Sequence, residues 1–123
     1  MKTILVVDDE LGSAEVLSLI LEEEGYKAYC AVNGRQALVQ ARDVVPDLVI
    51  VDYMMPLMNG GEMAQLVRAA PLHSKVPIVM TSATDEEQVE QHSEYYDAFL
   101  RKPYRWDDLF AIIRRLLASP KVN

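Results

Sequence analysis

The sequence has little that would suit an extracellular or membrane protein. It contains one cysteine among 123 residues, Cys30, so no disulfide can form within the chain, and a reducing compartment fits. The apolar neighbours of Cys30 predict a small buried side chain rather than a nucleophile. No apolar run approaches the roughly 20 residues of a membrane span, and the run near Met1 is too short for the core of a signal peptide. We therefore expect a cytoplasmic protein with no membrane contact.

Positive charge is also scarce. Lysine and arginine total 12 residues against 19 aspartates and glutamates, which leaves a formal net charge of −7. Proteins that bind nucleic-acid phosphates need clustered lysines and arginines, so we expect no direct binding of nucleic acid by this domain. An acidic domain of this kind needs partners of another class.

The length and the apolar content predict a single domain. Half of the residues are hydrophobic, which is enough for one core in a chain of this size. The sequence shows no repeat, low-complexity segment or internal linker. We expect residues 1–119 to form the domain and residues 120–123 to be a C-terminal tail or the start of a linker.

Short apolar segments alternate with segments of helical period. Strands are predicted over 3–8, 26–32, 47–52, 76–81 and 97–101, and three of them are continuous apolar runs, as in strands buried on both faces. Between them, apolar residues at helical spacing form three stripes: Val16, Leu17, Ile20 and Leu21; Met63, Leu66, Val67 and Ala70; and Leu109, Ile112, Ile113, Leu116 and Leu117. This alternation predicts an α/β fold, a doubly wound five-stranded parallel sheet with helices on both faces.

A helix is also predicted over residues 85–96, but its inner face is poor. Val89 is the one clearly apolar residue of that face, and Glu90 and Glu94 repel each other one turn apart. We expect this segment to be the least stable helix of the domain and the mobile part of any switch.

Polar residues end four of the five predicted strands. In an open parallel sheet, ligands bind beyond the carboxyl ends of the strands. If strands 3–8 and 47–52 are neighbours, about 4.8 Å apart, the carboxylates at their ends converge. Three crowded carboxylates repel one another unless a cation lies among them, and an all-oxygen site completed by water suits Mg²⁺. The residues at these four strand ends are Asp8 and Asp9, Asp52, Thr81 and Ser82, and Lys102.

Four motifs follow one another at these strand ends: "LVVDDE", "VDYMMPLMNG", "PIVMTSA" and "FLRKPY". In their order and spacing, the chain resembles the receiver domain of the response-regulator family of two-component signalling, over essentially its whole length. The resemblance implies a flavodoxin-like fold with strand order 2-1-3-4-5. It also implies a regulatory domain rather than an enzyme, one that catalyses only its own phosphoryl transfer and dephosphorylation.

The resemblance implies a phosphoacceptor and a metal site. Asp52 would accept a phosphoryl group from a phosphohistidine on a sensor histidine kinase or a phosphotransfer protein. Asp9, Asp52 and the main-chain carbonyl of Met54 would bind Mg²⁺ directly, and Asp8 would hold it through water. Such chemistry needs positioning and neutralisation of the phosphoryl oxygens, which a divalent cation and a lysine supply.

The resemblance also implies phosphoryl-binding groups and a switch. Ser82, with the amide of Ala83, would hold one phosphoryl oxygen, and Lys102 would pair with another. The Ser82 hydroxyl would move toward the phosphoryl group, and Phe99 would turn into the vacated space. The signal would be read on the face formed by the predicted fourth helix, the fifth strand and the last helix, by an output domain or target protein that the sequence does not identify.

Each assignment has a plainer alternative. Asp8 and Asp9 can be helix caps, and Asp52 a turn former. Lys102 can be a solvated loop charge, and Phe99 can simply fill the core. The methionines are expected to pack rather than to act as ligands, and His73 and His92 are expected on the surface.

Two other function classes remain open. A phosphatase of the haloacid-dehalogenase type also uses an aspartate after the first strand of a parallel sheet, but that class has Asp-x-Asp where this chain has "DDE". The second is a receiver-like protein-interaction module that is not phosphorylated. A phosphoryl analogue such as beryllofluoride with Mg²⁺ distinguishes this module from a switch.

Overall fold

The computed structural model describes residues 1–118, apart from the side chains of residues 92 and 93. Within these residues, five parallel strands form one sheet in the order β2-β1-β3-β4-β5. The strands are β1 (Thr3–Val7), β2 (Lys27–Ala31), β3 (Leu48–Asp52), β4 (Ile78–Ser82) and β5 (Ala98–Arg101). The predicted five-stranded, flavodoxin-like sheet and its strand order are confirmed.

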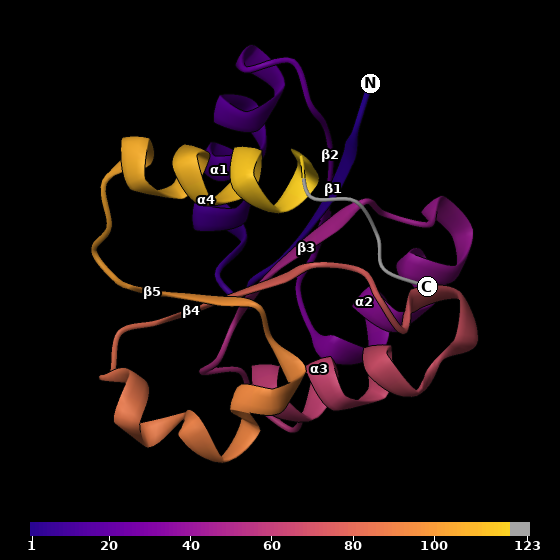
Figure 1. Ribbon diagram of the computed structural model, residues 1–123, viewed down its shortest axis with the longest axis vertical. Coiled ribbons are helices and arrows are strands. Elements are labelled where there is room, and N and C mark those ends of the chain that lie inside the picture. Colours follow the sequence, from indigo (N-terminus) through magenta and orange to yellow (C-terminus); the bar gives the residue numbers. More distant parts are fainter. Residues whose placement is uncertain (119–123) are drawn as a thin grey trace.

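Helices cover both faces of the sheet (Figure 1). One layer contains α1 (Leu11–Glu23) and α4 (Trp106–Ala118), and the other contains α2 (Gly34–Val44) and α3 (Gly60–Ala69). Each of these helices is too short or too polar to cross a membrane, as far as residues 1–118 show.

The central strands contribute side chains to two apolar clusters, one on each face of the sheet. In β1, Leu5 and Val7 pack on the side of α2 and α3, whereas Ile4 and Val6 pack on the side of α1 and α4. Successive side chains of a strand point to opposite faces, so a strand covered on both sides must be apolar at every position. This accounts for the continuous apolar runs in the sequence.

The start of α3 is held firmly behind the end of β3. Asn59 and Glu62 form a capping box, in which each side chain accepts a hydrogen bond from the other residue's main-chain N–H. Gly60 is required by close approach, because a Cβ at this position would lie 2.6 Å from the main-chain carbonyl oxygen of Asp52. The loop between β3 and α3 is therefore anchored at both ends.

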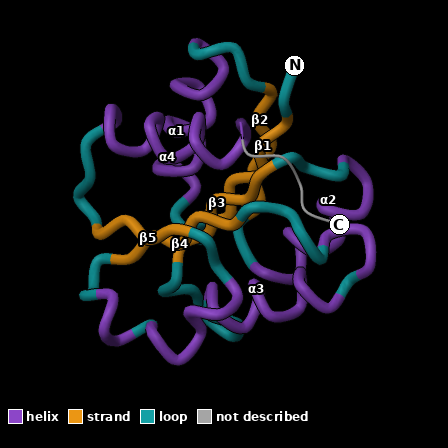
Figure 2. Tube along the Cα trace, viewed as in Figure 1, coloured by secondary structure: helices purple, strands orange, loops and turns teal. Residues whose placement is uncertain are grey.

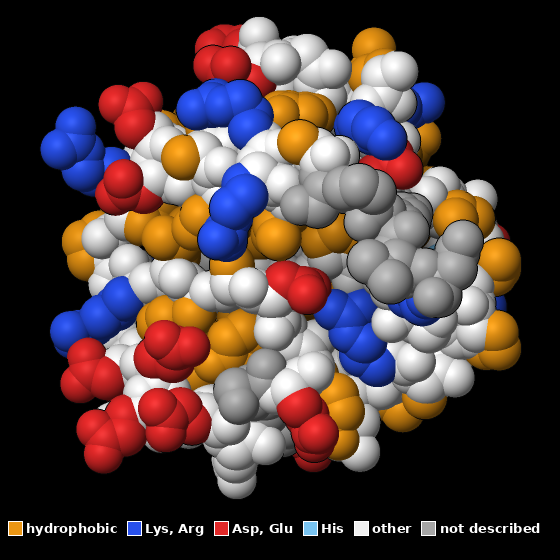
Figure 3. All heavy atoms as spheres, viewed as in Figure 1, with side chains coloured by type: hydrophobic (Ala, Val, Ile, Leu, Met, Phe, Trp, Pro, Cys, Tyr) orange, Lys and Arg blue, Asp and Glu red, His pale blue; other side chains and the backbone are white. Residues whose placement is uncertain are grey.

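The prediction of one continuous helix over residues 85–96 is wrong. The chain forms two short 3-10 helices there, η2 (Glu86–Gln88) and η3 (Glu90–Tyr95), and η3 lies beside α3 (Figure 2). Val89 is fully buried between them, but a single apolar residue cannot hold an α-helix against the sheet. Acidic side chains gather on the outer surface of this segment (Figure 3), where the exposed acids are Asp85, Glu86, Glu87, Glu90 and Glu94.

The surface position predicted for His73 is wrong. This residue ends the 3-10 helix η1 (Pro71–His73), and its ring is 3% exposed, with neither ring nitrogen hydrogen-bonded. The turn that follows α3 directs Leu72 outward and His73 inward, which the polar sequence around it did not indicate. The side chain of His92 lies outside the described residues. Cys30 is partly buried, and its Sγ lies 2.7 Å from the hydroxyl of Ser18.

Candidate functional site

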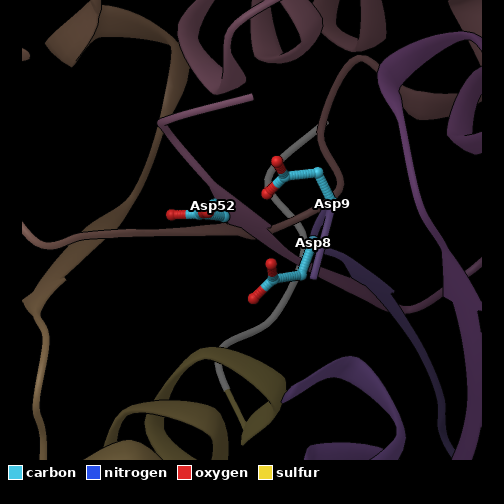
Figure 4. A group of neighbouring side chains, drawn as sticks. All are labelled: Asp8, Asp9 and Asp52. Carbon is cyan, nitrogen blue, oxygen red and sulfur yellow. The ribbon is translucent and has the colours of Figure 1, made fainter. Parts of the chain in front are cut away.

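Three carboxylates meet at the carboxyl ends of β1 and β3. Asp52 is the last residue of β3, and Asp8 follows the last residue of β1, with Val7 paired to Val51 in the sheet. Asp8, Asp9 and Asp52 each offer a carboxylate oxygen such that these oxygens all lie within 4.8 Å of one another. Figure 4 shows the three side chains next to one another, with Asp8 and Asp9 extending toward the side on which Asp52 lies. The convergence predicted from the two strand ends is confirmed.

The three acids differ in their surroundings. Asp8 and Asp52 are each 8% exposed, whereas Asp9 is open to solvent. One oxygen of Asp8 accepts a hydrogen bond from the main-chain N–H of Glu10 at 2.9 Å, just ahead of α1. The N-cap residue of α1 is Glu10, and this bond lies ahead of the helix, so the helix-cap alternative does not account for Asp8. The second oxygen of Asp8 faces Lys102.

Lys102 reaches into this cluster from the loop after β5. Its Nζ lies 3.2 Å from Oδ2 of Asp8 and 3.6 Å from Oδ1 of Asp52. Burial by itself would lower the pKa of Lys102, but the charges of Asp52 and Asp8 outweigh it and raise that pKa. Lys102 therefore stays charged beside the carboxylates and is not a solvated loop residue.

Burial controls the acidity of Asp52. Desolvation raises the pKa of Asp52 to about 6, and the charges of Asp8 and Asp9 act in the same direction, while Lys102 opposes them. A carboxylate with this pKa is largely ionised at neutral pH, as a nucleophile or a metal ligand must be.

The donor set suits a hard divalent cation. Carboxylate oxygens are the preferred protein ligands of Mg²⁺, which usually takes only one or two of them and completes its octahedral shell with water. A cation here would also offset the repulsion among Asp8, Asp9 and Asp52. Met54 lies two residues beyond Asp52, and its thioether sulfur is a poor ligand for Mg²⁺, so only its main-chain carbonyl could take part.

The end of β4 presents two hydroxyls, and they have different partners. Asp52 pairs with Thr81 in the sheet, and the Thr81 hydroxyl donates to the carbonyl of Val51 at 3.4 Å. Ser82 is fully buried one residue further, and its hydroxyl contacts Thr84 rather than any of the carboxylates. The sequence order indicated Ser82, but this contact with Thr84 was not predicted.

Phe99 and Ala83 lie on different sides of this region. Phe99 is partly buried against the core layer of α2 and α3, and its ring centroid is 6.3 Å from that of Tyr96. It is therefore apart from the carboxylates and next to η3. Ala83 is exposed and lines a cavity of about 750 Å³ together with Lys102 and Trp106.

Sequence reasoning also missed Tyr104. This tyrosine lines the same cavity two residues after Lys102, and burial together with Asp8 and Asp52 raises the pKa of Tyr104 to about 12. Its position directly after the "KP" dipeptide was the available signal.

The relatives that the sequence matches are named as regulators. The chain is 40% identical over 116 residues to the DNA-binding response regulator MtrA of Mycobacterium tuberculosis. The matched region covers 93% of this chain and 50% of that protein. It is 34% identical over 118 residues to the phosphate regulon transcriptional regulatory protein PhoB of Pseudomonas aeruginosa, covering 94% and 52% respectively. The chain therefore spans about half the length of these relatives.

Solved structures share the fold. Response regulator protein TrrA of Thermotoga maritima, in complex with Mg²⁺-BeF, matches with a TM-score of 0.86 and 34% identity, over 94% of this chain and 99% of that one. Chemotaxis protein CheY4 of Vibrio cholerae matches with a TM-score of 0.89 and 29% identity, over 94% and 98%. The sequence also matches the response regulator receiver domain family over residues 4–114. With sequence, fold and strand-end carboxylates in agreement, the chain belongs to the response regulator receiver domain family.

Proposed function

We propose that this domain is a phosphorylation-activated switch and that Asp52 is its phosphoacceptor. The observation that carries the proposal is the position of Asp52: it is buried, it lies among Asp8, Asp9 and Lys102, and it ends the central strand of the sheet. An oxygen of Asp52 attacks the phosphorus of a phosphohistidine, the P–N bond breaks, and the imidazole leaves. The product is an acyl phosphate, which water can hydrolyse.

The carboxylates are proposed to hold Mg²⁺. Asp9, Asp52 and the main-chain carbonyl of Met54 would bind it directly, and Asp8 would bind it through water. The three acidic side chains already converge, which supports this assignment. The cation would neutralise charge on the phosphoryl oxygens during transfer.

The phosphoryl group itself is proposed to be held by protein donors. Lys102 pairs with one oxygen, because its ammonium already lies 3.6 Å from the acceptor carboxylate. Ser82 and the amide of Ala83 donate to another oxygen from the neighbouring strand end. Phe99 then follows Ser82, and the altered face comprises η3, β5 and α4.

The partners and the limits of the domain are also proposed. The phosphoryl donor is a sensor histidine kinase or a phosphotransfer protein, and the receiver of the signal is an output domain or a target protein. We assign residues 1–119 to the receiver domain and 120–123 to a tail or linker, and residues 119–123 lie outside the described part of the chain. We place the domain in the cytoplasm and give it a regulatory role without turnover of an external substrate.

Acetyl phosphate tests the assignment of Asp52. With Mg²⁺, the wild-type chain should gain one acid-labile phosphoryl group, found by mass spectrometry at Asp52, and Asp52→Asn should gain none. Asp43→Asn, which changes an exposed carboxylate on α2, is the matched control and should be modified like wild type. A full yield from Asp52→Asn would contradict the proposal, and an unmodified wild type that also ignores beryllofluoride would favour the interaction module.

A further inference from the structure

The hydroxyl of Ser82 is engaged by Thr84 in this structure. The two side-chain oxygens, Oγ of Ser82 and Oγ1 of Thr84, are 2.8 Å apart, and the main-chain N–H of Thr84 donates to Oγ of Ser82 at 3.1 Å. Within the described residues these are the contacts that the Ser82 hydroxyl makes. Thr84, two residues after the last residue of β4, therefore provides both hydrogen-bond partners of this hydroxyl.

Burial decides which of the two hydroxyls donates. Ser82 is 0% exposed, so its proton has no water to bind and must go to a protein acceptor. Oγ of Ser82 already accepts the N–H of Thr84, and Oγ1 of Thr84 is the acceptor at hand. Thr84 is partly exposed, so its own proton can bind water. Ser82 is therefore the donor and Thr84 the acceptor.

We infer that Thr84 is a positioning residue that latches the Ser82 hydroxyl away from the phosphoryl site, so that phosphorylation must break the Ser82–Thr84 hydrogen bond. The inference rests on the proposed function, in which Ser82 donates to a phosphoryl oxygen on Asp52. A hydroxyl has a single proton, so Ser82 cannot donate to Thr84 and to the phosphoryl group at once.

The latch should act mainly on the unphosphorylated state. Without the Thr84 hydroxyl, the Ser82 proton is buried and unsatisfied before phosphorylation. Afterwards the phosphoryl oxygen takes that proton, and the main-chain N–H of Thr84 still donates to Oγ of Ser82. An unsatisfied buried donor costs more than an unused acceptor lone pair. Removal of the hydroxyl should therefore favour the phosphorylated form.

Beryllofluoride binding measures this preference. Calorimetric titration with beryllium chloride in excess fluoride, at saturating Mg²⁺, should give Thr84→Val an apparent Kd about fivefold lower than wild type, as expected for one net hydrogen bond. Thr84→Ser keeps the hydroxyl and should restore the wild-type Kd. In the Ser82→Ala background, Thr84→Val should have no effect, because the group that it latches is gone.

The outcomes separate the latch from the proposed function. An unchanged or weaker affinity of Thr84→Val would overturn the latch, and so would an equal gain in the Ser82→Ala background. A wild-type chain that binds no beryllofluoride would overturn the proposed function and the latch with it. Melting of each metal-free variant controls for folding, and Thr84→Ala is the second variant without the hydroxyl should Thr84→Val fail to fold.

Discussion

The carboxylate of Asp52 is only 8% exposed, with Asp8 and Asp9 beside it and the ammonium of Lys102 3.6 Å away. At the scale of single residues, burial and the two neighbouring acids therefore raise the pKa of Asp52, and the ammonium of Lys102 lowers it. Lys102 partly offsets the negative charge of the metal-free site. The lysine that would hold a phosphoryl oxygen thus also stabilises the resting carboxylates.

The raised pKa of Asp52 predicts a specific pH dependence of stability. The pKa of this carboxyl is about 6 in the folded chain against an ordinary 3.8, so the folded state binds its proton more tightly than the unfolded state does. The free energy of unfolding should fall as the pH rises from about 4 to about 6, and this contribution should be constant above. Asp52→Asn should remove that fall.

Urea unfolding in EDTA tests this at pH 4.5 and 7.5. Because one pKa unit corresponds to about 1.4 kcal/mol and solvent screens part of it, Asp52→Asn should be more stable than wild type at pH 7.5 by on the order of 1–2 kcal/mol. The gain should be smaller at pH 4.5. Asp43→Asn should follow the wild-type profile, and parallel profiles for wild type and Asp52→Asn would contradict the raised pKa.

At the scale of elements, the segment between β4 and β5 differs from the rest. The 3-10 helices η2 and η3 have poorer hydrogen-bond geometry than α-helices, and Val89 is their buried apolar residue. The C-terminal helix α4, by contrast, buries Leu109, Phe110 and Ile113. Phe99 and Tyr96 pack where this segment returns to β5. The face proposed to carry the signal therefore includes a segment with a single fully buried apolar residue, and we expect this segment to be the least stable of the domain.

Hydrogen exchange should reveal this weak anchoring. Amides of residues 88–96 should exchange faster than those of residues 109–117, because less apolar area must be exposed to open them. Mg²⁺ with beryllofluoride should slow exchange in 88–96 and leave 109–117 little changed. Equal protection in the two segments, unaffected by the phosphoryl mimic, would refute the proposed mobility of this segment.

The junction of β3 and α3 gives a second prediction at this scale. A Cβ on Gly60 would lie 2.6 Å from the Asp52 carbonyl oxygen, so Gly60→Ala should push α3 from the acceptor strand and lose about 1–3 kcal/mol of stability. A Cβ on Gly12 in α1 would meet no other atom within 4 Å, so Gly12→Ala should stabilise the chain by about 0.5–1 kcal/mol. Denaturant titrations measure the free energy of unfolding of both variants. Equal changes in the two variants would contradict the close approach of Gly60 to the Asp52 carbonyl oxygen.

At the scale of the whole molecule, the chain is acidic and concentrates three of its acids at one edge of the sheet. The net charge of −7 already disfavours compactness, and the cluster adds local repulsion that Lys102 only partly offsets. A divalent cation that binds there should therefore stabilise the entire domain, because it binds the folded chain and not the unfolded one.

Melting with Mg²⁺ tests this coupling. At about ten times its Kd, Mg²⁺ should add about 1.4 kcal/mol and raise the Tm by roughly 5 °C. Asp9→Ala should weaken the response, because it removes one of the three carboxylates, while Asp43→Ala should keep it. A wild-type Tm that millimolar Mg²⁺ leaves unchanged would rule out the proposed metal site.

The presence of the strands and the edge of the sheet that carries the site could be predicted from patterns along the chain. Continuous apolar runs occur only where a strand is covered on both faces, and parallel strands end at the same edge, so Asp8, Asp9 and Asp52 had to converge once β1 and β3 were neighbours. The same rule places Lys102 at this edge of the sheet, whereas the order of the strands came from the resemblance to receiver domains. These features depend on period and position along the chain, which a sequence displays directly.

Other features could not be predicted from the sequence, because they depend on packing between segments that are distant along the chain. The 3-10 form of residues 86–95 depends on how little Val89 can bury against α3, and the inward direction of His73 depends on the turn after that helix. The contact between Ser82 and Thr84 follows from the path of one loop. Side-chain burial and hydrogen-bond partners depend on residues that are close in space, and these residues cannot be identified from the local sequence.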